Sequence, residues 1–407
     1  MMSLQSLFEE QAKRLRKISL SKKRYLYAQM DWSLTCIGIL GQRGLGKTTM
    51  MLQYLKEHYN GSDKALYISL DNPYFQSLSL YDFAMEFERY GGEVLLIDEV
   101  HKYEDWSIHI KAIYDASNLR VVFSGSSILH ISKQKGDLSR RAVVYHLENL
   151  SFREYLSFKG IFTCEPVSME ALLENHVSIA NTVASEIKPL KYFKEYLEFG
   201  AYPFVLEDKE NYHQRIIHVI NLILETDLPY INKIEMAQIG KLKKLLYLLA
   251  INVPFIPNIT DLATATQISR PKIYEYLNHL ERANIINSVR SKEKGYSLLS
   301  KPEKLLMQNT NLSYALSTTA DKGSLREAFF VNQIKNAYAK NIRLLDESIY
   351  TSKQGDYLVD NTYTFEVGGK QKGFEQIKEL PNSYVAADDI EVGYKHKIPL
   401  WLFGFLY

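Results

Sequence analysis

The stretch that decides the fold is GQRGLGKT at residues 41–48, followed by VLLIDEV at residues 94–100. The first segment has the spacing G-x-x-x-x-G-K-[ST], in which a glycine-rich loop turns its backbone N–H groups onto phosphate oxygens. It follows the apolar run at residues 34–40 and precedes a stretch without Gly or Pro at residues 48–58. The sequence therefore predicts a strand, a phosphate-binding loop and a helix, in that order.

The second segment places two carboxylates at the end of a buried strand. We expect Asp98 to hold Mg²⁺ with the hydroxyl of Thr48, and Glu99 to orient and deprotonate an attacking water. Lys47 is expected to reach the β- and γ-phosphates. The loop residues expected at the nucleotide are Gly41, Gln42, Arg43, Gly44, Leu45, Gly46, Lys47, Thr48 and Thr49. Both motifs, each in its expected context, predict that the chain binds a nucleoside triphosphate with Mg²⁺ and hydrolyses it.

The composition indicates a folded protein of ordinary type. The 407 residues are 46% hydrophobic and 24% charged, and the net charge of +2 gives no argument for a nucleic-acid partner. No apolar run reaches the roughly 20 residues that span a bilayer, and the early acids at the N-terminus do not fit a secretory signal. The only cysteines are Cys36 and Cys164. These features predict a cytoplasmic protein, without a membrane partner, whose thiols are buried and reduced.

Residues 31–150 are expected to form the core of a P-loop ATPase. Apolar runs alternate there with helical stretches, which is typical of a parallel sheet with crossover helices. The runs are TCIGILG, KALYISLD, VLLIDEV, LRVVFSGSS and AVVYHLE. The fourth run ends in Ser124 and Ser126. A hydroxyl at this edge, Ser124 first, would bond the γ-phosphate or the attacking water; the alternative is a simple Ser-Gly turn.

Basic residues on either side of the core have two interpretations each. Arg140 and Arg141 precede the fifth run, where a guanidinium would stabilise charge on a neighbouring subunit's nucleotide, or where an ordinary surface pair would lie. Arg153 is a third candidate, expected instead to pair with Glu154 or its helix neighbours. Residues 1–30 form a basic helical arm, for which a solvated face is favoured over a phosphate-contacting one.

Three further parts are expected after the core. Residues 151–245 show helical periodicity around a Gly-Ala-Tyr-Pro break at 200–203, and we interpret them as a helical lid. Residues 246–318 resemble a winged helix in their pattern, with helices at 260–269 and 270–286 and a β-wing at 286–300. The second helix would bring Arg270, Lys272 and Tyr274 to a DNA major groove, although such a module also serves for packing alone.

Residues 319–407 are expected to form a separate α/β unit. A helix at 324–339 precedes a hairpin-like stretch at 355–370, and residues 398–407 read as a buried terminal strand.

Taken in order, several segments resemble the prokaryotic AAA+ ATPases of the archaeal-ATPase-like type, over nearly the whole chain. The segments are GQRGLGKTT, LYISLDNP, VLLIDEVHKY, FSGSS, SRRAVVYHLENLSFREYL, GAYP, KPEKLLMQNTNL, REAFF and EVGGK. The resemblance implies the roles already given to Lys47, Thr48, Asp98 and Glu99. It also implies that Arg141 is the arginine finger, because the family's Gly-Arg step corresponds to Arg140-Arg141; Arg140 departs from that glycine.

The resemblance further implies a C-terminal domain related to restriction-endonuclease folds. Such a site needs a metal-binding Asp, then (D/E)-x-K on the next strand, where the lysine steadies the attacking water. Here Gly368 stands in the lysine's place, and Lys370 comes two residues late. We therefore predict a degenerate domain that leaves plasmid DNA supercoiled. The acidic candidates are Asp356 or Asp360, Glu366 and, as an accessory, Glu327.

The favoured function is an AAA+ ATPase that couples hydrolysis to a conformational change in an unidentified protein or nucleic-acid partner, with a homo-oligomer among the expected assemblies. One alternative is a DNA-processing ATPase whose C-terminal domain is an active nuclease. Another is a slow nucleotide-controlled binding switch. Basal ATP turnover and its response to DNA would separate the three.

Overall fold

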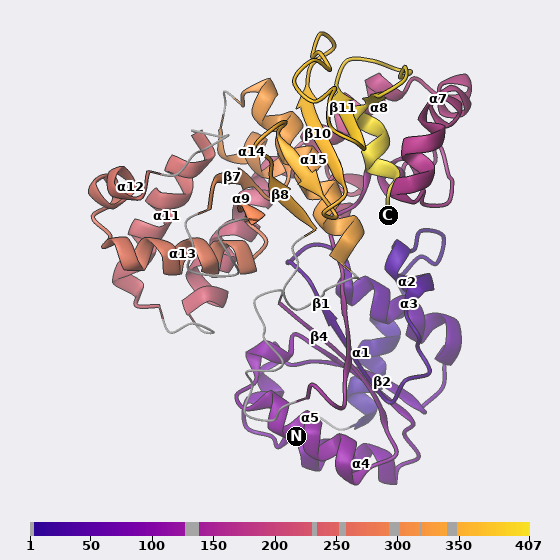
Figure 1. The fold of residues 1–407 in the computed structure, drawn as a ribbon. Helices are drawn as coiled ribbons and strands as arrows, with labels where there is room; N and C mark the ends of the chain where they lie inside the picture. The colour runs from indigo at the N-terminus through magenta and orange to yellow at the C-terminus, as the bar shows by residue number, and fades with distance from the viewer. Residues whose placement is uncertain are drawn as a thin grey trace. The chain divides into compact units, whose positions relative to one another are not determined.

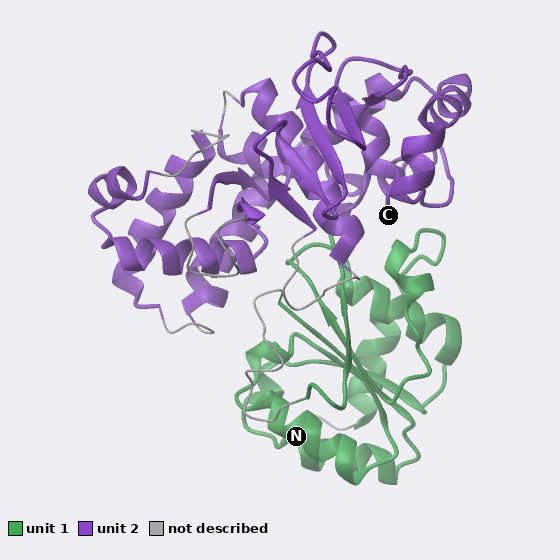
Figure 2. Cartoon of the chain, in the orientation of Figure 1, with its two compact units in different colours: residues 1–148 green, residues 149–407 purple. Residues whose placement is uncertain are grey.

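The computed structural model describes residues 4–126, 138–229, 234–251, 258–292, 302–317, 320–339 and 348–407 (Figure 1). The chain divides into two compact units, unit 1 at residues 1–148 and unit 2 at residues 149–407 (Figure 2). Each unit is built around its own sheet.

Unit 1 contains a five-stranded sheet in the order β2-β3-β4-β1-β5, and every pairing is parallel. The predicted parallel sheet is confirmed, and each predicted apolar run forms one strand. The strands are β1 (Cys36–Leu40), β2 (Ala65–Ser69), β3 (Val94–Asp98), β4 (Arg120–Gly125) and β5 (Val143–His146). β1 and β3 are buried along their whole length, as expected for parallel strands with covered faces.

Helices α3 (Lys47–Tyr59), α4 (Leu80–Arg89) and α5 (Trp106–Ala116) connect these strands. Crossovers between parallel strands are right-handed. The chain crosses from β1 to the far edge at β2 and then returns through β3 to β4, so α3 covers one face and α4 and α5 cover the other. α4 and α5 pack on each other, as do α3 and the N-terminal helix α1 (Leu4–Arg16). The carboxyl ends of the strands meet at one edge, where the loop after β1 lies.

The N-terminal helix α1 protects the edge strand β2. The Gln11 side chain donates to the carbonyl of Ala65 at 3.1 Å and accepts from the N–H of Tyr67 at 2.7 Å. These two bonds continue the strand's hydrogen-bonding pattern onto a side chain, so the edge does not offer a free template for pairing. Leu7 and Leu15 lie on the same buried face of α1. A short helix, α2 (Tyr25–Gln29), completes the arm.

The first part of unit 2 is helical. Its helices are interrupted at residues 200–203, as predicted, between α8 and the short helix η4. The helices are α6 (Phe152–Phe158), α7 (Met169–Glu186), α8 (Pro189–Phe199), η4 (Pro203–Leu206), α9 (Tyr212–Leu222), η5 (Ile223–Asp227) and α11 (Met236–Ile251). α6, α7 and α8 pack on the C-terminal end of the chain. The segment interpreted as a lid therefore belongs to unit 2 and shares its core with the C-terminal sheet.

Two predicted helices of the winged-helix pattern are present as α12 (Ile259–Thr266) and α13 (Arg270–Arg282). The apolar face expected on the second helix is buried, and it consists of Ile273, Tyr276, Leu277 and Leu280. β6 (Ile286–Val289) pairs antiparallel with β7 (Lys304–Met307). The tip of the predicted wing lies outside the described residues.

The C-terminal sheet has the order β12-β11-β10-β9-β8 and mixes parallel with antiparallel pairs. The predicted hairpin is confirmed: β9 pairs antiparallel with β10, and Asp360 and Asn361 both adopt positive φ at its turn, the backbone of a tight hairpin turn. Helix α14 (Thr310–Leu316) precedes α15 (Lys322–Tyr338), which packs on β10. The strands are β8 (Ile349–Thr351), β9 (Tyr357–Val359), β10 (Tyr363–Gly368), β11 (Ser383–Ala387) and β12 (Lys397–Pro399).

The predicted strand at residues 398–407 is wrong beyond its first residues. β12 ends at Pro399, and the chain continues as the buried 3₁₀ helix η8 (Leu400–Phe405). Proline has no N–H for the ladder, and the following rings pack on helices: Phe403 lies 4.9 Å from Phe330, and Phe405 lies 5.9 Å from Phe152, between ring centroids. A short, fully apolar run does not distinguish a buried strand from a buried helix.

Candidate nucleotide site and a second polar cluster

The phosphate loop depends on glycine at three positions for two different reasons. Gly44 and Gly46 have φ of 82° and 93°, a left-handed conformation that side chains disfavour. Gly41 instead allows a close approach, because a Cβ there would lie 2.5 Å from the carbonyl oxygen of Leu147. The motif thus supplies both the bend of the loop and its contact with the chain beyond β5.

Lys47 begins α3 and is buried inside the loop. Its Nζ donates to the carbonyl oxygens of Gly41 and Gln42, at 2.8 and 3.0 Å. The ammonium therefore lies among the loop's backbone, beside the helix N-terminus with its partial positive charge. Gln42 and Leu45 are buried, whereas Gly44 and Thr49 are exposed. The sequence-predicted lysine and loop are brought together.

Asp98 accepts hydrogen bonds from side chains on three elements, α3, β2 and β4. Thr48 Oγ1 donates to Asp98 Oδ2 at 2.6 Å, and the hydroxyl of Tyr67 donates to the same oxygen at 2.7 Å. Ser124 Oγ bonds to Asp98 Oδ1. Asp98 is only 2% exposed, so these donors compensate the burial of its charge. Three sequence-predicted residues, Thr48, Asp98 and Ser124, therefore meet in one network.

Tyr67 is the member of this network that sequence reasoning missed. It lies on β2, where Ser69 pairs with Asp98, and it is 4% exposed. Burial first, and then the charge of Asp98, raise the pKa of Tyr67 well above its ordinary value. The phenol therefore stays protonated and acts as a donor. Tyr67 could have been identified as a neighbour of Asp98 from its position on β2, the strand next to β3 in the sheet.

Glu99 is held by two basic side chains. Its Oε1 lies 3.8 Å from Arg43 Nη1, in the phosphate loop, and its Oε2 lies 3.3 Å from His101 Nε2. The Glu99 backbone has φ of 56°, a conformation that costs a non-glycine residue on the order of 1–3 kcal/mol and that clusters at functional sites. The carboxylate is thus ion-paired with the loop that would carry the nucleotide.

The candidate arginine finger forms an ion pair within its own chain. Arg141 donates to both carboxylate oxygens of Asp115, on α5, at 2.8 and 2.9 Å, and these bonds lower the pKa of Asp115. Arg140 is exposed. Arg153 donates to the main-chain oxygens of Tyr407 and Cys164, so its expected pairing with Glu154 is wrong. Asp115 lay too far away in sequence to be foreseen.

The expectation of a solvated N-terminal arm is wrong at Arg24. This side chain is 5% exposed and donates to the carbonyls of Leu45, in the phosphate loop, and Glu148, each at 2.6 Å. Burial raises the pKa of Glu148 to about 7, although the nearby Arg24 acts against the shift. A carboxyl that ionises near neutral pH therefore ends unit 1.

Glu148→Gln should remove a pH dependence of stability. The folded pKa of about 7 exceeds the ordinary value of 4.5, so between these values the unfolded chain releases a proton that the folded chain retains. The free energy of unfolding then falls as pH rises through this window. The free energy of unfolding of Glu148→Gln minus that of the parent should therefore increase by about 3 kcal/mol between pH 4.5 and pH 8. Urea unfolding at each pH measures this difference. The exposed Glu104→Gln is the matched control, and parallel pH curves for parent and Glu148→Gln would contradict the assignment.

A second polar cluster lies in the C-terminal sheet. Lys372 Nζ forms an ion pair with Glu366 on β10 and lies 3.9 Å from Asp356 Oδ2. Lys304 Nζ lies 2.7 Å from Glu327 Oε2 and 3.7 Å from Asp356 Oδ1. The structure thus gathers three of the acids named from the sequence. The fourth candidate, Asp360, is exposed in the hairpin turn.

For the role of the missing lysine, sequence reasoning overlooked Lys372 and considered only Lys370. That residue is exposed. Lys372 instead folds back over Gly368, where an added Cβ would lie 2.8–2.9 Å from its Cβ, Cγ and Cδ atoms. The glycine that displaced the lysine from its usual strand position therefore also makes room for a lysine from farther along the chain.

The cluster has two adjacent carboxylates for a cation. Burial, and then the neighbouring charge of Asp356, raise the pKa of Glu366, while Lys372 acts in the opposite direction. In the part of the chain that the structure describes, no group of three His, Cys, Asp or Glu side chains is arranged to hold a metal ion. Weak binding of a hard cation by Asp356 and Glu366 stays a prediction.

The surface proposed for DNA on α13 is partly neutralised. Lys272 pairs with Glu275 at 2.8 Å, Arg270 is exposed and Tyr274 is half-buried. Contact of these residues with DNA stays a prediction.

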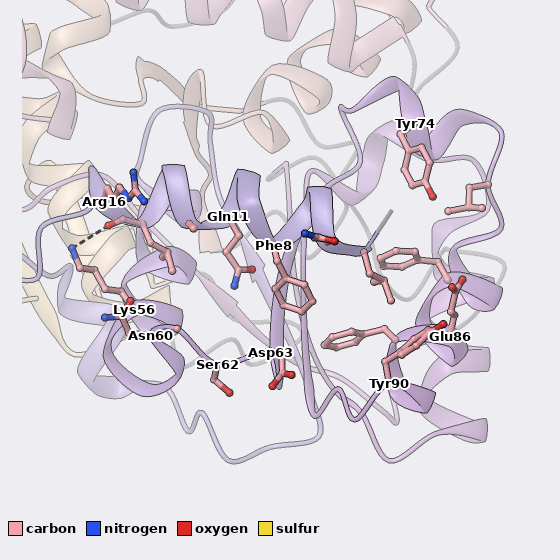
Figure 3. Close-up of a pocket in the computed structure, with 18 of the residues that line it drawn as sticks. Phe8, Gln11, Arg16, Lys56, Asn60, Ser62, Asp63, Tyr74, Glu86 and Tyr90 are labelled. Carbon is pink, nitrogen blue, oxygen red and sulfur yellow. Dashed lines mark hydrogen bonds between the residues drawn. The ribbon is translucent and has the colours of Figure 1, made fainter. Parts of the chain in front are cut away.

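A cavity of 1290 Å³ lies between α1, the end of α3 and α4 (Figure 3). Phe8, Phe83 and Phe87 line its apolar part, and Arg16 and Lys56 also line it. It contains none of the residues predicted for nucleotide chemistry.

Two family models match the chain. Residues 34–156 match a family described as an AAA domain, and residues 190–323 match a domain of unknown function. The first match contains the phosphate loop, Asp98, Glu99 and Ser124. Within the described residues, no helix has the length and apolar character needed to cross a membrane.

Curated relatives include two uncharacterized proteins. One, from Methanocaldococcus jannaschii, is 27% identical over 296 residues, which are 69% of this chain and 62% of that protein. The other, from Haemophilus influenzae, is 22% identical over 396 residues, 90% of this chain and 92% of that protein. The chain thus spans less than two thirds of the length of the archaeal relative.

Solved structures give only a distant likeness. AMPPCP-bound DnaA from Aquifex aeolicus has a TM-score of 0.24 and 16% identity, over 69% of this chain and 91% of that one. A katanin structure has a TM-score of 0.24 and 13% identity, over 40% of this chain and 58% of that one. Scores this low carry no argument about this chain. Residues 34–156 thus match an AAA domain, and the parallel sheet with its phosphate loop agrees with a P-loop fold.

Proposed function

We propose that unit 1 binds ATP with Mg²⁺ and hydrolyses it, and that hydrolysis drives a conformational change in a protein or nucleic-acid partner. The observation that carries the proposal is the network at Asp98, which joins Thr48 of the phosphate loop to Ser124 of β4. These groups, with Lys47 beside them, are the set that phosphoryl transfer requires.

Each residue has one role in this proposal. Lys47 exchanges its bonds to the loop carbonyls for the β- and γ-phosphates. Thr48 and Asp98 would hold Mg²⁺, which would neutralise charge on the phosphates. Ser124 orients the attacking water or the γ-phosphate, and Glu99 takes the water's proton after leaving Arg43.

Phosphate release by the purified full chain tests the proposal. With ATP and Mg²⁺ we expect steady turnover that stops in excess EDTA. Binding of ATP with very slow turnover would favour the nucleotide-controlled switch, and stimulation by DNA would identify a nucleic-acid partner. Lys47→Ala and Glu99→Gln separate binding from chemistry.

We further propose that Arg141 acts on the nucleotide of a neighbouring subunit after leaving Asp115. Arg141→Ala should then lose turnover but retain nucleotide affinity, and mixing it with Glu99→Gln subunits should restore some activity, because a mixed assembly contains one intact interface. Asp115→Asn is the control: it removes the partner of a solvent-exposed ion pair, which water and salt screen, and leaves the finger in place. Equal losses in both variants, without complementation, would assign Arg141 a purely structural role.

A second candidate function is metal-dependent cleavage of a phosphodiester by the C-terminal sheet. The specific observation is the position of Lys372 beside Glu366 and Asp356. Asp356 and Glu366 would hold a divalent cation, whose chemistry is to polarise the phosphate and the attacking water. Lys372 would steady that water by donating to its oxygen.

On this function, supercoiled plasmid should be nicked in Mn²⁺ or Mg²⁺, contrary to the expectation from the sequence. Lys372→Ala and Asp356→Ala should abolish nicking because each removes one member of the cluster. Lys370→Ala, two residues away and exposed, should leave nicking unchanged. Plasmid that stays supercoiled with either metal would remove this function and leave the cluster as a set of structural ion pairs.

A further inference from the structure

The chain beyond β5 lies directly against the start of the phosphate loop. The N–H of Leu147 donates to the carbonyl of Leu40, the residue before the loop, at 2.8 Å. The Cα of Gly41 lies so near the carbonyl oxygen of Leu147 that a Cβ would be 2.5 Å from it. The first residues of the loop therefore cannot shift without displacing Leu147.

Arg24 makes a separate connection to the loop, at Leu45 rather than at Gly41. One guanidinium nitrogen donates to the carbonyl of Leu45 and the other to the carbonyl of Glu148, each at 2.6 Å. Leu45 lies between the two left-handed glycines of the loop, and Glu148 is the last residue before unit 2 begins at Asn149. A guanidinium is rigid and planar. A displacement of one carbonyl that moves the guanidinium therefore also changes its hydrogen bond to the other carbonyl.

The arm that carries Arg24 is fastened to α3, the helix that continues from the loop. Gln53 of α3 donates to the carbonyls of Ser19 and Lys22, both at 2.8 Å. Lys23 pairs with Glu57 of α3 at 2.6 Å. These contacts fix the backbone on the N-terminal side of Arg24, so the buried guanidinium has a defined place between the loop and residue 148.

We propose that Arg24 is a positioning residue that transmits the state of the phosphate loop to residue 148, and through it to the chain that enters unit 2. The inference rests on the proposed binding of ATP at the loop. It supplies a route by which nucleotide in unit 1 changes unit 2, using two backbone carbonyls and one side chain. Such coupling requires an element that contacts both ends, and the guanidinium does so through its two carbonyl acceptors.

Hydrogen exchange of the full chain, followed by mass spectrometry with and without a non-hydrolysable ATP analogue, tests the proposal. In the parent protein the analogue should change exchange in peptides covering residues 143–152. Arg24→Ala should lose this change while still binding a labelled analogue. Arg24→Lys, which keeps the charge but reaches one carbonyl at a time, should retain part of it. Lys17→Gln, at an exposed basic residue of the same arm, should behave like the parent.

The outcomes separate this proposal from the proposed function. If the analogue binds the parent and changes hydrogen exchange equally in the parent, Arg24→Ala and Arg24→Lys, the role of Arg24 is overturned and the proposed function is not. Analogue that binds without any change at residues 143–152 would also overturn the role of Arg24. Absence of analogue binding by the parent would overturn the proposed function, and the coupling with it. If Arg24→Ala does not fold, full retention of the change in Arg24→Lys decides against the two-carbonyl bridge.

Discussion

Lys47→Ala should abolish ATP binding. The substitution removes the one ammonium that lies inside the phosphate loop, where Nζ contacts the carbonyls of Gly41 and Gln42. In a nucleotide complex that charge would face the β- and γ-phosphates, and charge-assisted hydrogen bonds are among the strongest in proteins. We expect affinity to fall by at least about 100-fold, equivalent to about 2.7 kcal/mol, in titration with a labelled ATP analogue.

The matched control for this variant is Lys64→Ala. Lys64 belongs to the same unit, but its side chain is 57% exposed and pairs with Glu93, and water and salt screen such an exposed pair. It should bind the analogue as the parent does. Parent-like affinity in Lys47→Ala, with a normal unfolding midpoint, would mean that nucleotide does not bind at this loop.

Glu99→Gln should retain nucleotide and lose turnover. The amide has the size of the carboxylate and still orients a water, but it does not take a proton at neutral pH. Loss of general-base catalysis typically lowers the rate by about 10²- to 10⁴-fold, measured as steady-state phosphate release. The substitution also removes the negative charge that pairs with Arg43 of the phosphate loop, so affinity should be equal to or higher than that of the parent.

Glu104→Gln provides the comparison for Glu99→Gln. Glu104 is an exposed acid shortly after β3, and its substitution should leave both affinity and rate unchanged. A Glu99→Gln rate close to that of the parent would place the base elsewhere. If Glu99→Gln keeps ATP bound, as expected, this variant can be used to capture the partner from native lysate.

The sequence predicted the core of unit 1 well because its signals are local. Buried parallel strands read as continuous apolar runs, and the five runs named from the sequence are the five strands. Phosphate binding needs glycines and a lysine at fixed spacing along one loop, so Gly41, Gly46 and Lys47 could be assigned without tertiary structure. Thr48 and Asp98, which the motifs predict to share Mg²⁺, are joined directly by a hydrogen bond in the structure.

The sequence alone failed where one side chain depends on another far along the chain. The terminal apolar run formed a 3₁₀ helix after Pro399 because rings from two helices pack around it. Lys372 was overlooked because strand spacing counts along the backbone, whereas a long lysine can fold back over Gly368.

What the sequence by itself determined was the phosphate loop, the parallel sheet and the carboxylates that end β3, since each follows from residue types at short fixed spacing. Only the tertiary structure decided that Tyr67 donates to Asp98, that Arg43 holds Glu99, and that Arg24 joins the loop to residue 148. These contacts span elements that become neighbours only when the sheet and its arm assemble. No local pattern encodes them, because a buried charge takes whichever acceptor the packed chain brings within hydrogen-bonding distance.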